Sequence, residues 1–594
     1  MPGYDAPVRD MRFLYHELGD VARLAQCPGF GEVTPDLVDA ILEEAAKFAA
    51  EILQPLNRSG DEEGCELTDG CVSTPVGFKA AYTGFVDNGW GTLTCAADYG
   101  GQGLPGTLAL MVEEMFSSAN MAFAMYPGLT HGAYRALETH GSEELKERYL
   151  PRLATCEWGG TMCLTESQCG TDLGLVRTRA EPTEAGSYRI SGSKIFISAG
   201  DHDLAENIVH LVLARLPDAP EGIRGISLFL VPKFIVNDDE TLGPANGVVC
   251  SALEHKMGIR ASATCAIEFS ESEGFLVGQP NRGMAAMFTM MNAARLGVGV
   301  QGLALAEAAY QGAVGYAHER VQGRALKGAK YPDQAADPII VHPDVRQMLL
   351  RMRALTEGAR AVGVWVSTEL DVSVHHSDAN ERQAADDLVQ LLTPVIKAFF
   401  TDIGFEVSNL GVQVFGGHGY IREHGMEQYV RDARITQIYE GTNGVQALDL
   451  VGRKLPAHMG RYLRSFFHPV SEFIEREKGP DGMDEFVEPL GKAFGRLQRA
   501  TARIAEQGLN DPDEAGAAAS DYLKLFGFVA LAFAWARMAK LALAQEQSDD
   551  AAFYRAKIRT ARYYMQRVLP ASSGHFSALM AGGSSTMDFD DADF

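Results

Sequence analysis

Glu440 lies in a short loop whose residue types could support proton transfer. The loop, Tyr439-Glu-Gly-Thr-Asn-Gly444, directly precedes residues 445–451, whose pattern predicts a helix. Thr442 or Asn443 is expected to cap that helix, because a short side-chain oxygen can accept from the first backbone amides. A carboxylate held there, partly removed from water, could act as a general base. The alternatives are an exposed loop glutamate or a favourable charge near the helix dipole.

Two further segments are suited to holding an anion or a flat ring. Residues 162–174 combine hydroxyls, glycines and backbone amides that could bind an anion, although such clusters are usually turns. Residues 194–200 predict a strand on which Phe196 and Ser198 share one face. An aromatic ring beside a hydroxyl suits a heteroaromatic ligand that needs stacking and an edge hydrogen bond. A core phenylalanine and a strand-end serine are the alternative.

A glycine-rich segment, Gln413-Val-Phe-Gly-Gly-His-Gly-Tyr420, allows close approach of a ligand to the backbone, for example a phosphate. Its glycines do not fit the G-x-G-x-x-G pattern, and no predicted strand precedes them, so it is not a Rossmann fingerprint. No second His or Cys accompanies His418 at metal-ligand spacing, and we predict no metal site.

The composition limits the classes of partner and compartment. The chain has 594 residues and a net charge of −26, which argues against general nucleic-acid binding. Its nine cysteines form no C-x-x-C pair, and the N-terminus lacks an apolar core, so we expect a cytoplasmic protein. The most apolar run, Leu525–Ala536, is too short to span a bilayer and is typical of a buried helix.

The chain length exceeds what one core usually supports, and the patterning divides it into successive parts. Residues 35–160 are typical of helices. Short β-branched runs at 188–191, 194–198, 208–215, 225–231 and 266–269 predict a small antiparallel β unit. Helical patterning returns from about residue 282 to 454, and a further helical region covers roughly 460–572 before an acidic tail.

Together, in this order and at these intervals, the motifs resemble the signatures of acyl-CoA dehydrogenases. Residues 163–172 are similar to the first signature of that family, 413–432 to the second, and 439–442 to its catalytic-base motif. Asp98–Gly101, Glu254–Ser262 and Glu319-Arg320 also match in order. The resemblance covers roughly residues 35–455. The remaining C-terminal part is like that of a long bacterial subgroup that includes 3-methylmercaptopropionyl-CoA dehydrogenases.

The resemblance implies a mainly α fold with a small β domain. It implies an N-terminal helical domain at 1–160, a middle β-barrel-like domain at 161–280 and a C-terminal four-helix bundle at 281–455. An additional helical domain with an acidic tail would occupy residues 456–594.

The implied reaction is FAD-dependent α,β-dehydrogenation of an acyl-CoA thioester to a trans-2-enoyl-CoA. Glu440 would remove the α-proton while a hydride passes from the β-carbon to flavin N5. The substrate would be 3-methylmercaptopropionyl-CoA or a fatty acyl-CoA. The alternatives are an acyl-CoA oxidase of the same fold that uses O₂, and a non-catalytic flavoprotein.

The resemblance also assigns binding residues and partners. The expected partners are an acyl-CoA, an electron-transfer flavoprotein and a second copy of the chain, with no nucleic acid and no membrane. The residues assigned to the substrate are Thr171, Arg295 and Gly441. The residues assigned to FAD are Leu164, Thr165, Gly170, Thr171, Phe196, Ser198, Thr442 and Asn443, with Arg320, Gln413, Gly416 and Gly417 reaching the FAD of a neighbouring subunit.

Overall fold

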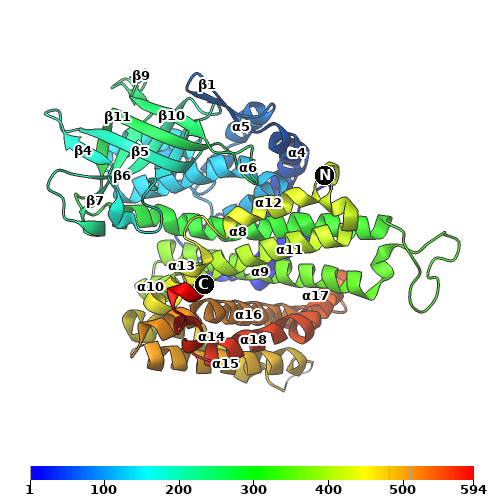
Figure 1. The fold of residues 1–594 in the computed structure, drawn as a ribbon. Helices are drawn as coiled ribbons and strands as arrows, with labels where there is room; N and C mark the ends of the chain where they lie inside the picture. The colour runs from blue at the N-terminus through cyan, green and yellow to red at the C-terminus, as the bar shows by residue number, and fades with distance from the viewer. Residues whose placement is uncertain (1, 480–481, 509) are drawn as a thin grey trace. The chain divides into compact units, whose positions relative to one another are not determined.

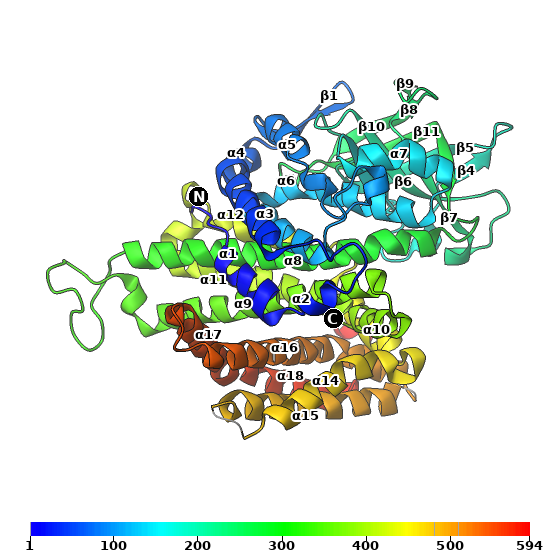
Figure 2. The same cartoon turned by 180° about the vertical axis from the view of Figure 1, so that it is seen from behind.

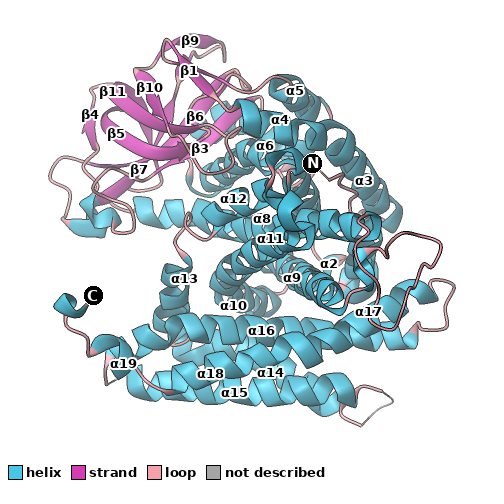
Figure 3. Ribbon diagram, turned by 45° about the vertical axis from the view of Figure 1, so that its right-hand side comes forward, coloured by secondary structure: helices cyan, strands magenta, loops and turns pink. Residues whose placement is uncertain are grey.

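The computed structural model describes residues 2–479, 482–508 and 510–594 (Figure 1). The chain forms two compact units, which are described separately. The helical unit contains Met1–Ala46, Gly106–Ser118 and Val298–Phe594, and the β-containing unit contains Lys47–Pro105 and Ala119–Gly297. Figure 3 shows the strands gathered in one part of the chain, among helices. The predicted mainly α fold with a small β domain is confirmed.

The β-containing unit is built around one seven-stranded sheet, in the order β10-β11-β5-β4-β6-β3, with β7 pairing with β11 and β6. Two small two-stranded sheets accompany it, and one of them, β1–β2, lies in a region for which we predicted only helices. The strands are β1 Glu66–Thr68, β2 Cys71–Ser73, β3 Trp158–Cys163, β4 Arg179–Pro182, β5 Tyr188–Ser198, β6 Asn207–Arg215, β7 Ile226–Pro232, β8 Phe234–Val236, β9 Leu242–Ala245, β10 Val248–Leu253 and β11 Thr264–Val277.

The prediction of an antiparallel sheet is wrong on both sides of β6, because β4 also pairs in parallel with β6, with Arg179 opposite Arg215. β3 pairs in parallel with β6, from Trp158 opposite Asn207 to Cys163 opposite Val212. Parallel neighbours need a crossover connection, and here the chain passes through β4 and β5 between them. Nearly every residue of β6 is buried, as expected for a strand covered on both faces, so its sequence lacks the alternation that marks a solvent-facing strand.

Two apolar clusters cover the two faces of this sheet. Val209, Leu211 and Leu213 of β6 pack in the cluster that contains helix residues such as Tyr134, Tyr149 and Met287. Val212 and Ala214 of the same strand pack in the second cluster, with Ile197, Phe229 and Cys265. Successive side chains of a strand point to opposite faces, so one strand serves both cores. The helices of the unit include α4 Gln54–Glu63, α5 Phe78–Asp87 and α7 Glu143–Ala154.

Long helices dominate the helical unit, and three helices, α3, α6 and α8, have residues in both units. α6 Gly106–His140 is interrupted by non-helical backbone at Asn120, and α8 Gly283–Glu319 enters the helical unit at Val298. Figure 2 shows α2 lying along α9. The other helices are α1 Val8–Arg12, α2 Val21–Leu24, α3 Pro35–Phe48, α9 Pro343–His375, α10 Ala379–Val395, α11 Thr401–Phe415, α12 Met426–Thr436, α13 Asn443–Asp449, α14 Arg461–Glu477, α15 Asp484–Gly508, α16 Pro512–Ala544, α17 Ala551–Tyr563, α18 Ser572–Met580 and α19 Ser584–Met587.

The apolar run Leu525–Ala536 forms the centre of α16, and the predicted buried helix is confirmed. Trp535 donates a hydrogen bond from Nε1 to the Ala354 carbonyl at 2.9 Å, which fixes α16 against α9. Gly358 makes that approach possible, because a Cβ there would lie 2.7 Å from the Trp535 Nε1. By length and composition, residues 379–420 and 512–544 could each cross a bilayer, but 78% and 83% of their apolar windows are buried within the protein, as in core helices.

Candidate active site

The Glu440 loop has an unusual backbone. Glu440 has φ +56° and Gly441 has φ +84°, so two consecutive residues lie in the left-handed region. A non-glycine residue there costs roughly 1–3 kcal/mol, and such residues concentrate at functional sites. Thr442 caps α13 by accepting from the Val445 amide at 3.4 Å, which settles the choice of cap between Thr442 and Asn443.

The Asn443 side chain ties this loop to neighbouring helices. Its Nδ2 donates to the Ala398 carbonyl at 3.1 Å, to the Thr401 hydroxyl at 3.0 Å and to Asp402 at 2.8 Å. Its Oδ1 accepts from Lys397 Nζ at 3.0 Å. The side-chain amide is therefore engaged within the chain, and the expected FAD contact of Asn443 stays a prediction.

The residues on either side of Glu440 are also anchored. Gln446 donates from Nε2 to the Glu440 carbonyl at 3.1 Å, and the Tyr439 hydroxyl donates to Gln301 Oε1 on α8. Burial, followed by the charge of Glu440, raises the pKa of Tyr439 well above its usual range. The phenol therefore stays protonated and can donate this hydrogen bond. The loop thus holds a half-buried carboxylate in a defined position, which a general base requires.

A second set of predicted residues lies where α8 ends, beside the glycine-rich segment that follows α11. The Tyr316 ring stacks on Phe415 at 4.1 Å, and its hydroxyl is 2.8 Å from His418 Nδ1. Arg320, one turn after Tyr316, directly follows α8, and it is exposed, as are Gln413, Gly416 and Gly417. A Cβ on Gly417 would meet no atom within 4 Å, so packing within the chain does not require glycine there. The open backbone fits close approach by a phosphate.

In the β-containing unit, a buried ion pair positions Leu164 and Thr165. Lys194 donates from Nζ to Glu166 at 2.8 Å and to the Leu164 carbonyl at 3.0 Å, and the Ile195 amide donates to the Thr165 carbonyl at 2.9 Å. Burial opposes ionisation of Glu166, but the charge of Lys194 and hydrogen bonds from Thr178 and Arg177 outweigh it and lower its pKa to about 2. The loop is therefore held against β5. Sequence reasoning missed this pair, because nothing in the sequence signals the contact.

Replacing Glu166 with glutamine should destabilise the protein by about 3 kcal/mol at pH 7, because its folded pKa is about 2 instead of 4.5. A carboxyl whose pKa is lower in the folded state stabilises the fold at any pH above the unfolded-state pKa. This stabilisation is lost as the pH falls from 4.5 towards 2. Urea unfolding should therefore give the same difference at pH 7 and pH 5.5. Glu271→Gln, which breaks an exposed pair with Arg189, should change stability by less than about 0.5 kcal/mol. Equal effects of the two variants would contradict the assignment.

Phe196 departs from the predicted strand alternation. Its φ is +59°, and the pairing of β5 with β11 shifts register between Ile197 and Lys194, which marks a β-bulge. Lys194 is buried while Phe196 is 59% exposed, so the two do not share a face as a regular strand would require. Ser198 is half-buried at the end of β5. The bulge turns the aromatic ring outward, where it can contact a flat ligand.

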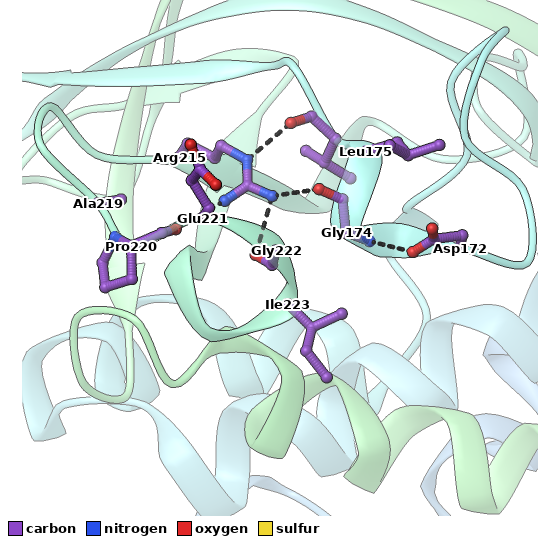
Figure 4. Close-up of a pocket in the computed structure, with 10 residues that line it drawn as sticks. Asp172, Gly174, Leu175, Arg215, Ala219, Pro220, Glu221, Gly222 and Ile223 are labelled. Carbon is purple, nitrogen blue, oxygen red and sulfur yellow. Dashed lines mark hydrogen bonds between the residues drawn. The ribbon is translucent and has the colours of Figure 1, made fainter.

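Gly170 and Thr171 are exposed on the loop that leads to a shallow hollow of about 520 Å³ (Figure 4). Arg215 holds the rim of this hollow together. Its guanidinium donates to the carbonyls of Gly174 at 2.6 Å, Val176 at 2.8 Å, Gly222 at 2.9 Å and Pro220 at 3.1 Å. These bonds join the predicted anion-binding segment to the β6–β7 connection, so Arg215 has a structural role.

Arg295 lies on α8 in a run of seven half-buried residues, 291–297. Its Nε is buried and has no hydrogen-bond partner among the described residues. Buried polar atoms are normally paired, so Arg295 is suited to bind a ligand group. Within the described ranges, no group of three His, Cys, Asp or Glu side chains is arranged to hold a metal ion.

The predicted residues divide between the two units. One set, in the helical unit, contains Glu440, Gly441, Thr442 and Asn443, together with the exposed group around Arg320. The other set, in the β-containing unit, contains Leu164–Thr171, Phe196, Ser198 and Arg295. In the helical unit the open glycines can approach a phosphate, and in the β-containing unit the outward aromatic ring of Phe196 can contact a flat ring, so each set taken by itself has groups of the kind that FAD requires. Sequence reasoning missed Gln301, Lys397 and the Glu166–Lys194 pair.

Four family models match consecutive parts of the chain. They are the acyl-CoA dehydrogenase N-terminal domain at residues 36–157, its middle domain at 161–272, its C-terminal domain at 281–455 and an acetyl-CoA dehydrogenase C-terminal-like domain at 466–590.

Individual proteins match over nearly their whole length. A 3-methylmercaptopropionyl-CoA dehydrogenase of Ruegeria pomeroyi is 44% identical over 98% of this chain and 99% of its own. A butyryl-CoA dehydrogenase of Syntrophomonas wolfei is 34% identical over 99% of this chain and 98% of its own. The crystal structure of Caenorhabditis elegans ACDH-11 has the same fold, with a TM-score of 0.77 at 21% identity over 95% of this chain and 91% of its own. This chain therefore belongs to the acyl-CoA dehydrogenase family and is an FAD-dependent oxidoreductase.

Proposed function

We propose that this protein oxidises a short acyl-CoA thioester to the trans-2-enoyl-CoA, with Glu440 as the base. The observation that carries the proposal is the anchored, left-handed Glu440 loop, in a chain 44% identical to a 3-methylmercaptopropionyl-CoA dehydrogenase. The substrate loses its α-proton to Glu440 and a hydride from its β-carbon. FAD, when bound, supplies the acceptor for that hydride.

The residues of this chain hold and place the reacting groups. Gln446 and Asn443 fix the loop, so that the Glu440 carboxylate meets the α-carbon without reorganisation. The Lys194–Glu166 pair holds the backbone of Leu164 and Thr165, which are proposed to bind the flavin ring. Phe196, Ser198, Gly170 and Thr171 are proposed to complete that cofactor site, and Arg295 and Gly441 to contact the substrate.

We propose 3-methylmercaptopropionyl-CoA or butyryl-CoA as the substrate, because relatives covering the whole chain carry those names. The test is anaerobic mixing of the purified holoenzyme with a panel of acyl-CoAs that differ in chain length and in a thioether. Short substrates should bleach the flavin absorbance, and the enoyl product should appear in equal amount. If none of the acyl-CoAs bleaches the flavin, the protein would be a non-catalytic flavoprotein, and the proposal would fail.

We propose an electron-transfer flavoprotein as the acceptor, and an oxidase of the same fold is the alternative. Stopped-flow reoxidation of the reduced enzyme separates the two. Rapid reoxidation by the flavoprotein and slow reoxidation by air are expected, and the reverse order would identify an oxidase.

We also propose that the protein is a cytoplasmic homodimer. Arg320, Gln413, Gly416 and Gly417 are all exposed on the helical unit, where a second copy could supply the cofactor phosphates that they are predicted to bind. Light scattering should give twice the mass of the 64.3 kDa chain. Cell fractionation would test the compartment.

Asn443→Ala should lower kcat for butyryl-CoA by about 10- to 100-fold, because a small displacement of the base is costly. KM should change by less than about threefold, because Asn443 acts through the position of Glu440 and not through substrate binding. Steady-state kinetics gives both constants. Gln383→Ala, which removes a hydrogen bond to Asp387 on α10, is the control and should leave kcat unaltered. A rise in KM at constant kcat would contradict the positioning role.

A further inference from the structure

Two polar side chains from different elements are hydrogen-bonded beside Glu440 in the helical unit. The Tyr439 hydroxyl donates to Gln301 Oε1 of α8, and Gln301 is only 8% exposed. Glu113 of α6 is near enough for its charge to raise the pKa of Tyr439, after the larger effects of burial, Glu440 and Asp432. The wall beside the candidate base is therefore polar.

The Glu113 carboxyl distinguishes this wall from an ordinary hydrogen-bonded core. No hydrogen bond or ion pair to it is found among the described residues, although its neighbour Glu114 binds Arg360 in three ways. Burial raises the pKa of Glu113 to about 7, yet its side chain keeps some accessible surface. Buried carboxyls are normally paired, so an unpaired one that remains accessible is a candidate for contact with a ligand.

Close helix packing prevents Gln301 from moving away. A Cβ on Gly302 would lie 2.5 Å from the Phe400 carbonyl oxygen, and one on Gly404 would lie 2.5 Å from the Gly302 carbonyl oxygen. α8 and α11 therefore touch through their backbones at this point. This close packing holds the α8 backbone in place next to Gln301.

We propose that Gln301, with Tyr439 and Glu113, forms the end wall of the acyl-binding site and selects short acyl groups that end in a thioether. This rests on the proposed function, because it takes the substrate α-carbon to lie at Glu440. The acyl group beyond that carbon then runs beside Tyr439 towards Gln301. Placing an apolar methylene against polar groups removes their hydration without a new hydrogen bond, whereas a thioether sulfur is a weak acceptor.

Two pairs of substrates test the wall. Pentanoyl-CoA and 3-methylmercaptopropionyl-CoA have equally long acyl chains and differ by a CH₂ or sulfur at one position. The binding experiment uses Glu440→Gln holoenzyme, in which reaction is slowed. Titration followed by the flavin spectrum should show that the thioether binds about threefold tighter than pentanoyl-CoA. Adding Gln301→Leu should bring the ratio of the two Kd values near one. For reaction, Gln301→Ala should raise kcat/KM for octanoyl-CoA relative to butyryl-CoA by about tenfold, because it opens the wall.

Gln311→Leu is the matched control. Gln311 lies on the same helix and also makes side-chain hydrogen bonds, to Asp5 and Glu307, but it does not contact Tyr439. In Gln311→Leu, the ratio of the two Kd values and the octanoyl-to-butyryl ratio of kcat/KM should both stay within about twofold of those of the unaltered protein. If Gln301→Ala does not fold, Tyr439→Phe, which removes only the hydroxyl, should shift the octanoyl-to-butyryl ratio in the same direction.

The outcomes separate this inference from the proposed function. If butyryl-CoA bleaches the flavin of the unaltered protein but the Gln301 and Tyr439 variants leave both ratios within twofold, the end wall is wrong and the proposed function stands. If no acyl-CoA bleaches the flavin, both are wrong.

Discussion

Glu440→Gln should lower the rate of flavin bleaching by butyryl-CoA by about 10²–10⁴-fold, which is the usual contribution of a positioned general base. Glutamine has nearly the same size as glutamate and can keep the loop conformation, but its amide cannot accept the α-proton. Rapid-mixing absorbance spectroscopy under anaerobic conditions measures this rate directly.

Binding distinguishes loss of the base from loss of the site. The Glu440→Gln protein should retain its yellow cofactor and still show a spectral shift when an acyl-CoA is added. Gln446 donates its hydrogen bond to the backbone carbonyl of residue 440, and changing the side chain of that residue leaves this bond in place. Glu488→Gln, the same change at an exposed position of α15, should bleach like the unaltered protein. Bleaching by Glu440→Gln at the normal rate would show that another group removes the proton.

Arg360→Met should destabilise the helical unit by about 3–5 kcal/mol, because it would leave buried carboxylates without their cation. Arg360 is 1% exposed and donates to Glu114 at 2.6 Å, to Asp10 at 2.6 Å and to Glu307 at 2.5 Å. Lys557, from α17, also binds Asp10. The Arg360 guanidinium thus joins the N-terminal segment, α6 and α8, and Lys557 links α17 to the same Asp10 carboxylate. Urea unfolding measures the loss on removing Arg360.

The loss should grow as the pH rises from 5.5 to 8. Burial already raises the pKa of Glu114 to about 7, despite the opposing charge of Arg360. A buried acid whose pKa is raised in the folded state does not destabilise the fold while it is protonated, but it does so once it ionises. Without Arg360, the loss of folding free energy caused by ionised Glu114 therefore appears at high pH. Arg562→Met, which breaks a partly exposed pair with Glu485, should cost less than about 1 kcal/mol at either pH. A pH-independent loss would contradict this account.

The elements that local pattern defines were predictable. The buried helix over Leu525–Ala536 and the strands near 188–198, 207–215 and 226–232 follow from runs of apolar or β-branched residues, because such runs must be buried in any fold. The Thr442 cap could also be anticipated, since a cap depends on residues within one turn of each other. The β1–β2 hairpin was missed because each strand has only three residues.

The features that failed prediction depend on distant partners. The alternation through Phe196 breaks because β11 shifts its register there, and β3 runs parallel to β6 because of the crossover between them. Neither partner is visible from the strand itself. Asn443 was a candidate helix cap in the sequence, but in the structure its side-chain amide binds Lys397, Ala398, Thr401 and Asp402, which lie more than forty positions earlier.

Residue types and spacing are sufficient to specify the Glu440 loop, the signature segments and the family, because these are short local patterns. Tertiary structure alone decided which groups hold the Glu440 loop and that the Glu113 carboxyl stays unpaired. It also decided that Arg360 binds three buried acids, Asp10, Glu114 and Glu307. Burial and charge pairing depend on side chains that are hundreds of residues apart, and their free energies are determined only once the helices are packed.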